Sequence, residues 1–163
     1  MNVVRGVLAE FLVARAVGDR TSARHAWSDW DVTVPNGPKI EVKSGGYLNS
    51  WTMRRLSRIE FNGLWGRRWD EATLKRDTAP TVIADVFVFA VHTCVMPASY
   101  NPRDLRQWEF YVVSSDIIKA RTAPKRRISL KFVQSHSAPV PWEALGGEVT
   151  RVWAETRRDG RRE

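Results

Sequence analysis

Four charged residues flank one turn, and their types and spacing could support chemistry on phosphates. Asp29 and Asp31 precede the segment Val-Pro-Asn-Gly-Pro, and Glu41 and Lys43 follow it. Carboxylate oxygens are the ligands that a hard cation such as Mg²⁺ prefers, and Mg²⁺ completes its shell with water and phosphate oxygens. A neighbouring ammonium can stabilise charge on a phosphate or orient an attacking water. These residues therefore predict a site for a divalent cation and a phosphate at the turn.

The turn itself decides whether the acids share one face of a hairpin. Pro35 suits the first central position of a type I turn and Asn36 the second, so that Gly37 takes the left-handed conformation. The resulting three-residue loop with a G1 bulge places Val32 opposite Ile40. A two-residue turn over Asn36 and Gly37 is the alternative.

The three-residue loop places Asp31 opposite Glu41, and Asp29 opposite Lys43. Two like charges directly across a ladder destabilise a hairpin unless a cation lies between them or one of them is protonated. We therefore interpret Asp31 and Glu41 as metal ligands. Asp29 is the rival of Asp31, although an ordinary ion pair with Lys43 is the structural interpretation of Asp29. The two-residue turn would place Asp31 opposite Val42 instead, on the other side from Glu41.

The helix that comes before the hairpin carries a further acid. Hydrophobic periodicity predicts a helix over residues 3–17 that ends at Gly18 and packs a wide apolar surface against a sheet. Glu10 lies along an apolar stripe of this helix with Val7 and Ala14. A carboxylate facing the sheet is costly unless it helps to hold the metal or its waters, and a glutamate at the edge of an amphipathic helix is the simpler alternative.

The remaining elements follow from short apolar and alternating runs. Strands are predicted at 29–34, 39–44, 57–64, 85–92, 108–113 and 127–133. A short helix is predicted at 114–120, and a last helix begins at Pro141, with Gly146 and Gly147 as a candidate break. A helix, then a meander of strands, then strands mixed with helices predicts an α/β sandwich around a mixed sheet.

Length, charge and cysteine content bound the class of protein. The 163 residues predict one domain over 1–155 and a basic tail at 156–163. The formal net charge of +8 favours nucleic acid as partner and not a membrane. The single cysteine, Cys94, excludes an internal disulfide and a cysteine-based zinc site. Since no apolar run is long enough to span a membrane and no signal peptide is recognisable, we expect a cytoplasmic protein.

Basic residues concentrate in the stretch from Arg54 to Arg76, where seven Lys and Arg residues outnumber three acids. Trp65 and Trp69 lie among them. The stretch predicts a surface for a polyanion, with the tryptophans available to stack on bases. A solvated face, with the tryptophans in the core, is the simpler alternative.

The pattern of Asp31, nine intervening residues and then Glu-Val-Lys at 41–43 resembles the PD-(D/E)xK nuclease superfamily. The helix with Glu10 and the strands that follow come in that family's order, and the resemblance covers roughly residues 5–92. It implies a restriction-endonuclease-like fold, with a central mixed sheet flanked by helices. It also implies a phosphodiesterase that depends on Mg²⁺ or Mn²⁺.

The resemblance also implies roles for individual residues. Asp31, Glu41 and the main-chain carbonyl of Val42 would hold the metal. Lys43 would be the catalytic lysine, and Glu10 an accessory acid.

Residues farther along would contact nucleic acid. Arg54, Arg55 and Arg58 would grip the flanking phosphates. Many relatives place a glutamine shortly after the lysine, where this chain offers the shorter Asn49, and the family's proline before the first acid is replaced by Trp30.

The function implied is, above all, a DNA endonuclease of repair, recombination or restriction. A catalytically inactive nucleic-acid-binding module and a ribonuclease on the same fold stay open as alternatives. Cutting of two strands by this fold usually needs two active sites, so a homodimer also stays open.

Overall fold

A four-stranded mixed sheet forms the centre of the protein in the computed structural model, which describes residues 2–19, 29–48, 56–70, 72–121 and 127–159. The strand order is β1-β2-β6-β7. Only β2 and β6 run parallel, whereas β1 is antiparallel to β2 and β7 antiparallel to β6. The bounds of the strands are β1 Val32–Thr33, β2 Lys39–Gly46, β6 Val86–His92 and β7 Trp108–Ser114. The predicted α/β class with a mixed sheet is confirmed.

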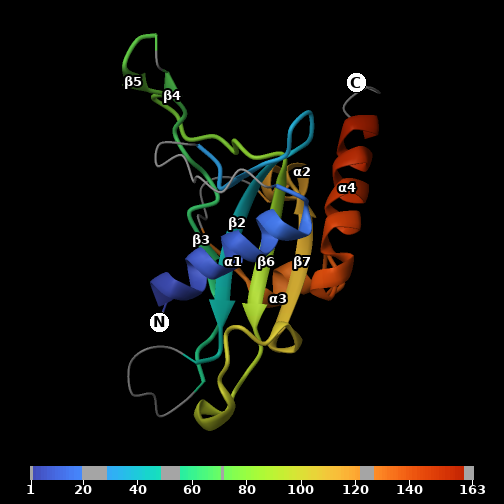
Figure 1. Ribbon diagram of the computed structural model, residues 1–163. Coiled ribbons are helices and arrows are strands. Elements are labelled where there is room, and N and C mark those ends of the chain that lie inside the picture. The colour runs from blue at the N-terminus through green and yellow to red at the C-terminus, as the bar shows by residue number, and fades with distance from the viewer. Residues whose placement is uncertain (1, 20–28, 49–55, 71, 122–126, 160–163) are drawn as a thin grey trace.

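Helices and short strands cover the two faces of this sheet (Figure 1). On one face α1, Asn2–Ala16, and α4, Trp142–Asp159, pack together over one hydrophobic cluster. The other face carries a second cluster. The elements over that second cluster are β3 Glu60–Asn62, β8 Arg127–Ser129, α2 Ser115–Ala120 and α3 Leu130–Gln134. The central strand predicted at 85–92 is confirmed as β6, since all seven of its residues are buried.

The buried face of α1 differs from the predicted one. Ala9, Leu12 and Val13 face the core, whereas Val7, which was expected on the stripe of Glu10, is 54% exposed. Glu10 itself is half-buried. The predicted stripe is therefore wrong by about one residue step around the helix.

The strand predicted over 127–133 is wrong in its second half. The hydroxyl of Ser129 accepts a hydrogen bond from the amide of Phe132, and this cap starts α3 at Leu130. Leu130 and Val133 are buried at helical spacing. Alternation alone does not distinguish this cap from a continuing strand.

The C-terminal helix runs without a break through both glycines. An added Cβ at Gly146 would lie 2.3 Å from the carbonyl oxygen of Ala16, so the glycine lets α1 and α4 approach closely. This contact explains a residue that is unfavourable in an isolated helix. The helix extends to Asp159, through the first four residues of the predicted tail.

A small hairpin stands apart from these layers. It consists of β4, Trp69–Asp70, and β5, Lys75–Arg76, and it projects from the body at the upper left of Figure 1. The sequence predicts no strands at these residues.

Candidate active site

The β1–β2 hairpin has the predicted register. Val32 lies opposite Ile40, which confirms the three-residue loop and contradicts the two-residue turn. The ladder stops after this pair.

The conformation of the loop differs from the prediction in one respect. Asn36, not Gly37, has the positive φ angle, at 57°. The amide of Gly37 donates to the carbonyl of Val34 at 2.8 Å, so Asn36 is the second central residue of a type II turn. Gly37 is needed for space, because a Cβ there would lie 2.7 Å from the Cβ of Val34.

Asp31 lies at the open edge of β2, just past the end of the ladder. Its amide donates to the carbonyl of Ile40 at 3.0 Å, and its Oδ2 accepts the amide of Val42 at 2.8 Å. The N–H and the C=O of one strand residue point to the same side. The carbonyl of Val42 therefore faces the same edge as the Asp31 carboxylate.

Glu41 and Lys43 project from the face of β2 opposite to Ile40 and Val42, which are buried with α1. The Nζ of Lys43 lies 2.6 Å from Oε1 of Glu41, and their side chains are 21% and 18% exposed. This ion pair is therefore largely withdrawn from solvent.

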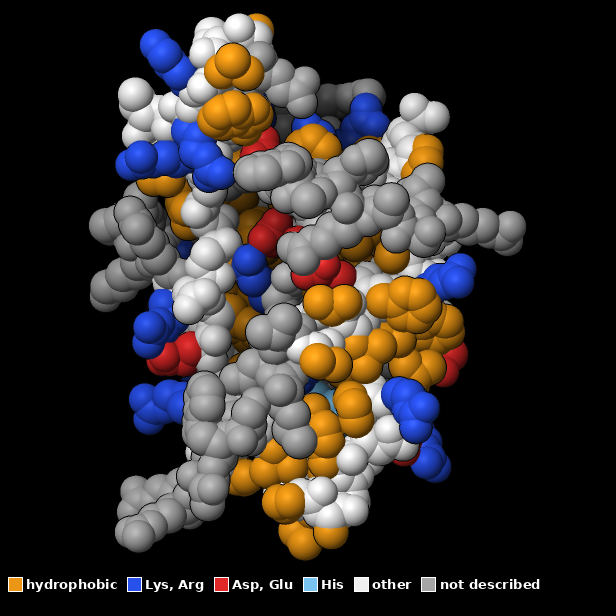
Figure 2. Space-filling model, turned by 60° about the vertical axis from the view of Figure 1, so that its left-hand side comes forward, with side chains coloured by type: hydrophobic (Ala, Val, Ile, Leu, Met, Phe, Trp, Pro, Cys, Tyr) orange, Lys and Arg blue, Asp and Glu red, His pale blue; other side chains and the backbone are white. Residues whose placement is uncertain are grey.

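Two of the acids predicted for the site, Asp31 and Glu10, act electrostatically on Glu41. Burial raises the pKa of the Glu41 carboxyl, the ammonium of Lys43 opposes this, and the negative charges of Asp31 and Glu10 raise the pKa further. Two other carboxylates therefore act on Glu41, one from the hairpin and one from α1. Figure 2 shows acidic side chains gathered beside a basic one midway up this face of the molecule.

The donor set suits a hard divalent cation. A cation between Asp31 and Glu41 would remove the repulsion that raises the pKa of Glu41. Among the described residues, no group of three or more His, Cys, Asp and Glu side chains is placed to hold a metal ion. Since Mg²⁺ commonly takes one or two carboxylates and completes its shell with water, the two acids and the carbonyl of Val42 would suffice in number as ligands.

A small cavity of about 50 Å³ adjoins this cluster. Asp29 and Glu41 line it together with Gly63, Leu64 and Gly66. Asp29 therefore remains the rival of Asp31 as a second acid. The wall formed by Gly63, Leu64 and Gly66 was not predicted as part of the site. Its two glycines were the only local feature of the sequence that could have indicated it.

The Gly63 wall lies close to the lysine of the site. Gly63 has a φ of +66°, and a Cβ there would lie 3.6 Å from the Nζ of Lys43. The segment that follows β3 therefore lies beside the ammonium of Lys43.

The predicted nucleic-acid contacts are only partly within the described residues. Asn49, Arg54 and Arg55 lie outside them. Arg58 is exposed just before β3. Trp65 packs against the second hydrophobic cluster, as the structural alternative had it, whereas Trp69 is 41% exposed.

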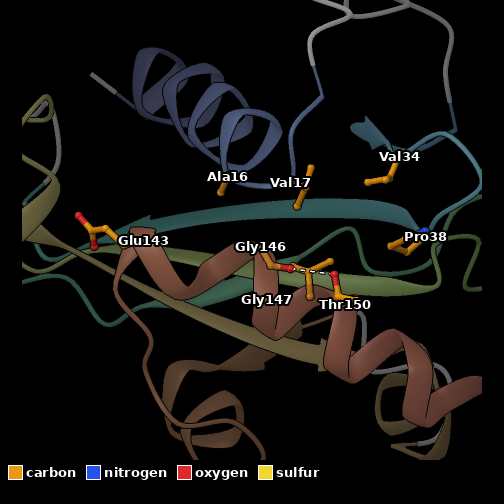
Figure 3. Close-up of a pocket in the computed structure, with 9 residues that line it drawn as sticks. Ala16, Val17, Val34, Pro38, Glu143, Gly146, Gly147 and Thr150 are labelled. Atoms are coloured by element: carbon orange, nitrogen blue, oxygen red, sulfur yellow. Dashed lines mark hydrogen bonds between the residues drawn. The ribbon is translucent and has the colours of Figure 1, made fainter.

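A larger cavity, of about 320 Å³, lies on the other side of the sheet between the end of α1, the β1–β2 loop and α4 (Figure 3). Its lining is mostly apolar or glycine, with Glu143 and Thr150 as polar exceptions, and the Thr150 hydroxyl donates to the carbonyl of Gly146 at 3.0 Å. It combines no acid pair with a lysine, so the small cavity is the better candidate for chemistry.

Comparison of the chain with models of known protein families finds no match, and comparison with curated proteins finds none either. Among the described residues, none of the helices is long and apolar enough to cross a membrane.

Proposed function

We propose that the protein is a metal-dependent phosphodiesterase that cleaves DNA at the edge of β2, on a restriction-endonuclease-like fold. One observation carries the proposal. Glu41 is a half-buried carboxyl that lies within electrostatic reach of two further carboxylates and contacts one ammonium at 2.6 Å. Such a grouping is costly for folding, and it matches what a divalent cation and a phosphate require.

Asp31, Glu41 and the carbonyl of Val42 would hold the cation, which is Mg²⁺ or Mn²⁺. When bound, the cation stabilises charge on a phosphate and makes a bound water a better nucleophile. Asp31 is held for this role by the amide of Val42 at 2.8 Å. Binding of the cation would therefore not have to order the Asp31 side chain.

Lys43 supplies the positive charge on the substrate side. Its ion pair with Glu41 fixes the Nζ, and two of its three N–H donors remain for a phosphate oxygen or the attacking water. Glu10 adds negative charge at the same place and strengthens the attraction for a cation. The arrangement supports in-line attack on a phosphate at the mouth of the small cavity.

The direct test incubates supercoiled plasmid, single-stranded DNA and RNA with the protein in Mg²⁺, Mn²⁺ or EDTA. We expect cleavage of DNA with either metal and none in EDTA. Glu41→Gln and Lys43→Met should each reduce the rate at least about 100-fold while leaving binding nearly intact. Cleavage of RNA alone would replace DNA with RNA as substrate, and binding without any cleavage would identify an inactive binding module.

Glu148→Gln is a matched control for these variants. Glu148 on α4 pairs with Arg151 at 2.6 Å, and its side chain is 21% exposed, so this acid resembles Glu41 in exposure and in the length of its ion pair. It lies on the helix that covers the other face of the sheet. Equal loss of cleavage in Glu148→Gln and Glu41→Gln would refute the assignment of the site.

A further inference from the structure

The hairpin formed by β4 and β5 belongs to an arm that begins beside the proposed site. Residues 67–80 leave the body at a bridge between Gly66 and Thr81, closed by two backbone hydrogen bonds of 2.9 and 2.7 Å. Gly66 also lines the small cavity next to Glu41. A substrate in the site therefore meets the base of this arm.

Nothing in the described part of the protein packs on the arm. All described residues from 67 to 80 are exposed, and none belongs to either hydrophobic cluster. A two-stranded hairpin alone in water is marginally stable at best. The arm is therefore not explained by folding of the body.

The two faces of the arm differ in charge. Trp69 lies opposite Arg76, so these two share one face. Arg67 comes two residues before Trp69, and because the amide of Asp77 still donates to the carbonyl of Arg68, we extend the alternation to place Arg67 on the same face. The other face carries two bases and two acids, namely Arg68, Asp70, Lys75 and Asp77. Among the described residues, which do not include Glu71, no acid lies on the face of Trp69, and we call this the Trp69 face.

Ion pairing within the described structure does not use the bases of the Trp69 face. No salt bridge between described residues involves Arg67 or Arg76. By contrast, the acid Asp70 has a structural role, because its Oδ1 accepts the amides of Ala72 and Thr73 in the turn. Within the described structure, the basic groups of the Trp69 face are thus available to a partner.

The tip of the arm presents an apolar side chain. Leu74 is 71% exposed and has a φ of 52°, a conformation that residues with a branched side chain adopt at a cost. The Asp70 hydrogen bonds hold this turn in place. Bases, an exposed tryptophan and an apolar tip therefore occur together on one ribbon, at the upper end of the face in Figure 2, where basic and hydrophobic side chains gather.

We infer that the Trp69 face of this arm, with Arg67, Trp69 and Arg76, binds a groove of duplex DNA beside the scissile phosphate. The inference rests on the proposed function and adds to it that the substrate is duplex and extends past the site. A two-stranded ribbon fits the major groove of B-DNA. About seven residues from base to tip reach about 20 Å, which spans about six base pairs.

The test measures binding of a 30-base-pair fluorescent duplex in EDTA, where no cleavage occurs. Arg67→Ala with Arg76→Ala should weaken binding at least tenfold and reduce the slope of log K against log salt by about two. Trp69→Ala should weaken it about fivefold or more. Arg68→Ala with Lys75→Ala removes the same charge from the other face and should change binding less than threefold.

Equal weakening by the two double variants would overturn the inference, because the effect would then follow net charge alone. Wild-type affinity in Arg67→Ala with Arg76→Ala would also overturn it, as would arm-dependent binding to vesicles of phosphatidylserine with none to the duplex. Since the arm lies outside both clusters, all variants should keep the wild-type thermal midpoint. Arm-dependent binding without cleavage in Mg²⁺ or Mn²⁺ would support the arm and refute the nuclease, whereas unchanged binding with normal cleavage would refute the arm alone.

Discussion

Removing Lys43 should destabilise the protein, whereas neutralising its partner Glu41 should not. In Lys43→Met the Glu41 carboxylate keeps its burial and the charges of Asp31 and Glu10 but loses its one favourable partner. In Glu41→Gln the charges of Asp31 and Glu10, which act on the carboxyl of Glu41, still favour an ammonium at this place. Replacing Lys43 is therefore expected to lower the free energy of unfolding more than replacing Glu41.

The magnitude follows from the geometry of the pair. At 2.6 Å and an effective dielectric constant near 20, Coulomb's law gives a gross attraction of about 6 kcal/mol. Loss of hydration on burial opposes most of this, and a charge-assisted hydrogen bond retains about 1.5–3 kcal/mol. We therefore expect Lys43→Met to lower the free energy of unfolding by about 2 kcal/mol, and the double variant to lie near wild type.

Urea unfolding of the wild type, both single variants and the double variant at pH 7.5 measures these values as a double-mutant cycle. The coupling should decline on acidification, because protonation of Glu41 removes the charge that Lys43 pairs with. The Glu148–Arg151 pair is the control; its arginine side chain is 54% exposed, so its coupling should stay below about 1 kcal/mol. Equal costs of Lys43→Met and Glu41→Gln would refute the proposed arrangement of charges.

Three further predictions concern Asp31, Glu41 and the two glycines of α4. Asp31→Asn keeps an acceptor for the amide of Val42 and should preserve the thermal midpoint while abolishing Mg²⁺ binding in calorimetry; Asp31→Ala should also lose about 1–2 kcal/mol. Because the pKa of Glu41 is raised in the folded protein, Glu41→Gln should be the more stable above that raised pKa. This gain should vanish as the pH falls toward the ordinary value of 4.5, which urea unfolding at several pH values would show. Gly146→Ala should lower the free energy of unfolding by at least about 2 kcal/mol. At Gly147 an added Cβ would have no atom within 4 Å, so Gly147→Ala should raise the free energy of unfolding by up to about 1 kcal/mol.

The register of the hairpin was predictable because its determinants are local. Three consecutive residues with strong turn preferences set the loop length, and the loop length sets which residues face each other. The left-handed residue was not predictable in the same way. A type II turn places it at Asn36, whereas the expected type I turn with a G1 bulge would place it at Gly37, and both turns give the same loop length.

Elements that depend on distant contacts were harder to predict. The run at 127–133 alternates like a strand, yet Ser129 caps a helix there and Leu130 and Val133 enter the second cluster. The unbroken C-terminal helix likewise depends on Gly146 meeting Ala16, which lies 130 residues earlier in the chain. In both places tertiary packing outweighs local preference.

The acids of the site were predictable as a group, but not the way in which the structure arranges them. Glu41 and Lys43 share a face because strand alternation requires it. The sequence indicated Asp31 as the direct neighbour of Glu41 across the ladder, whereas the ladder ends at Val32 and Asp31 binds the amide of Val42.

The short length of β1 leaves the edge of β2 beside Asp31 without a paired strand. A longer β1 would pair both the amide and the carbonyl of Val42, and the edge of β2 would then offer no main-chain oxygen. Because the Asp31 carboxylate accepts only the amide of Val42, that donor is satisfied while the carbonyl of Val42 faces the same edge as the carboxylate. An edge that needed protection only against pairing with another chain would require a charge of either sign. This edge combines an oxygen of the main chain with acids on two elements, and such a combination is what the proposed cation would require.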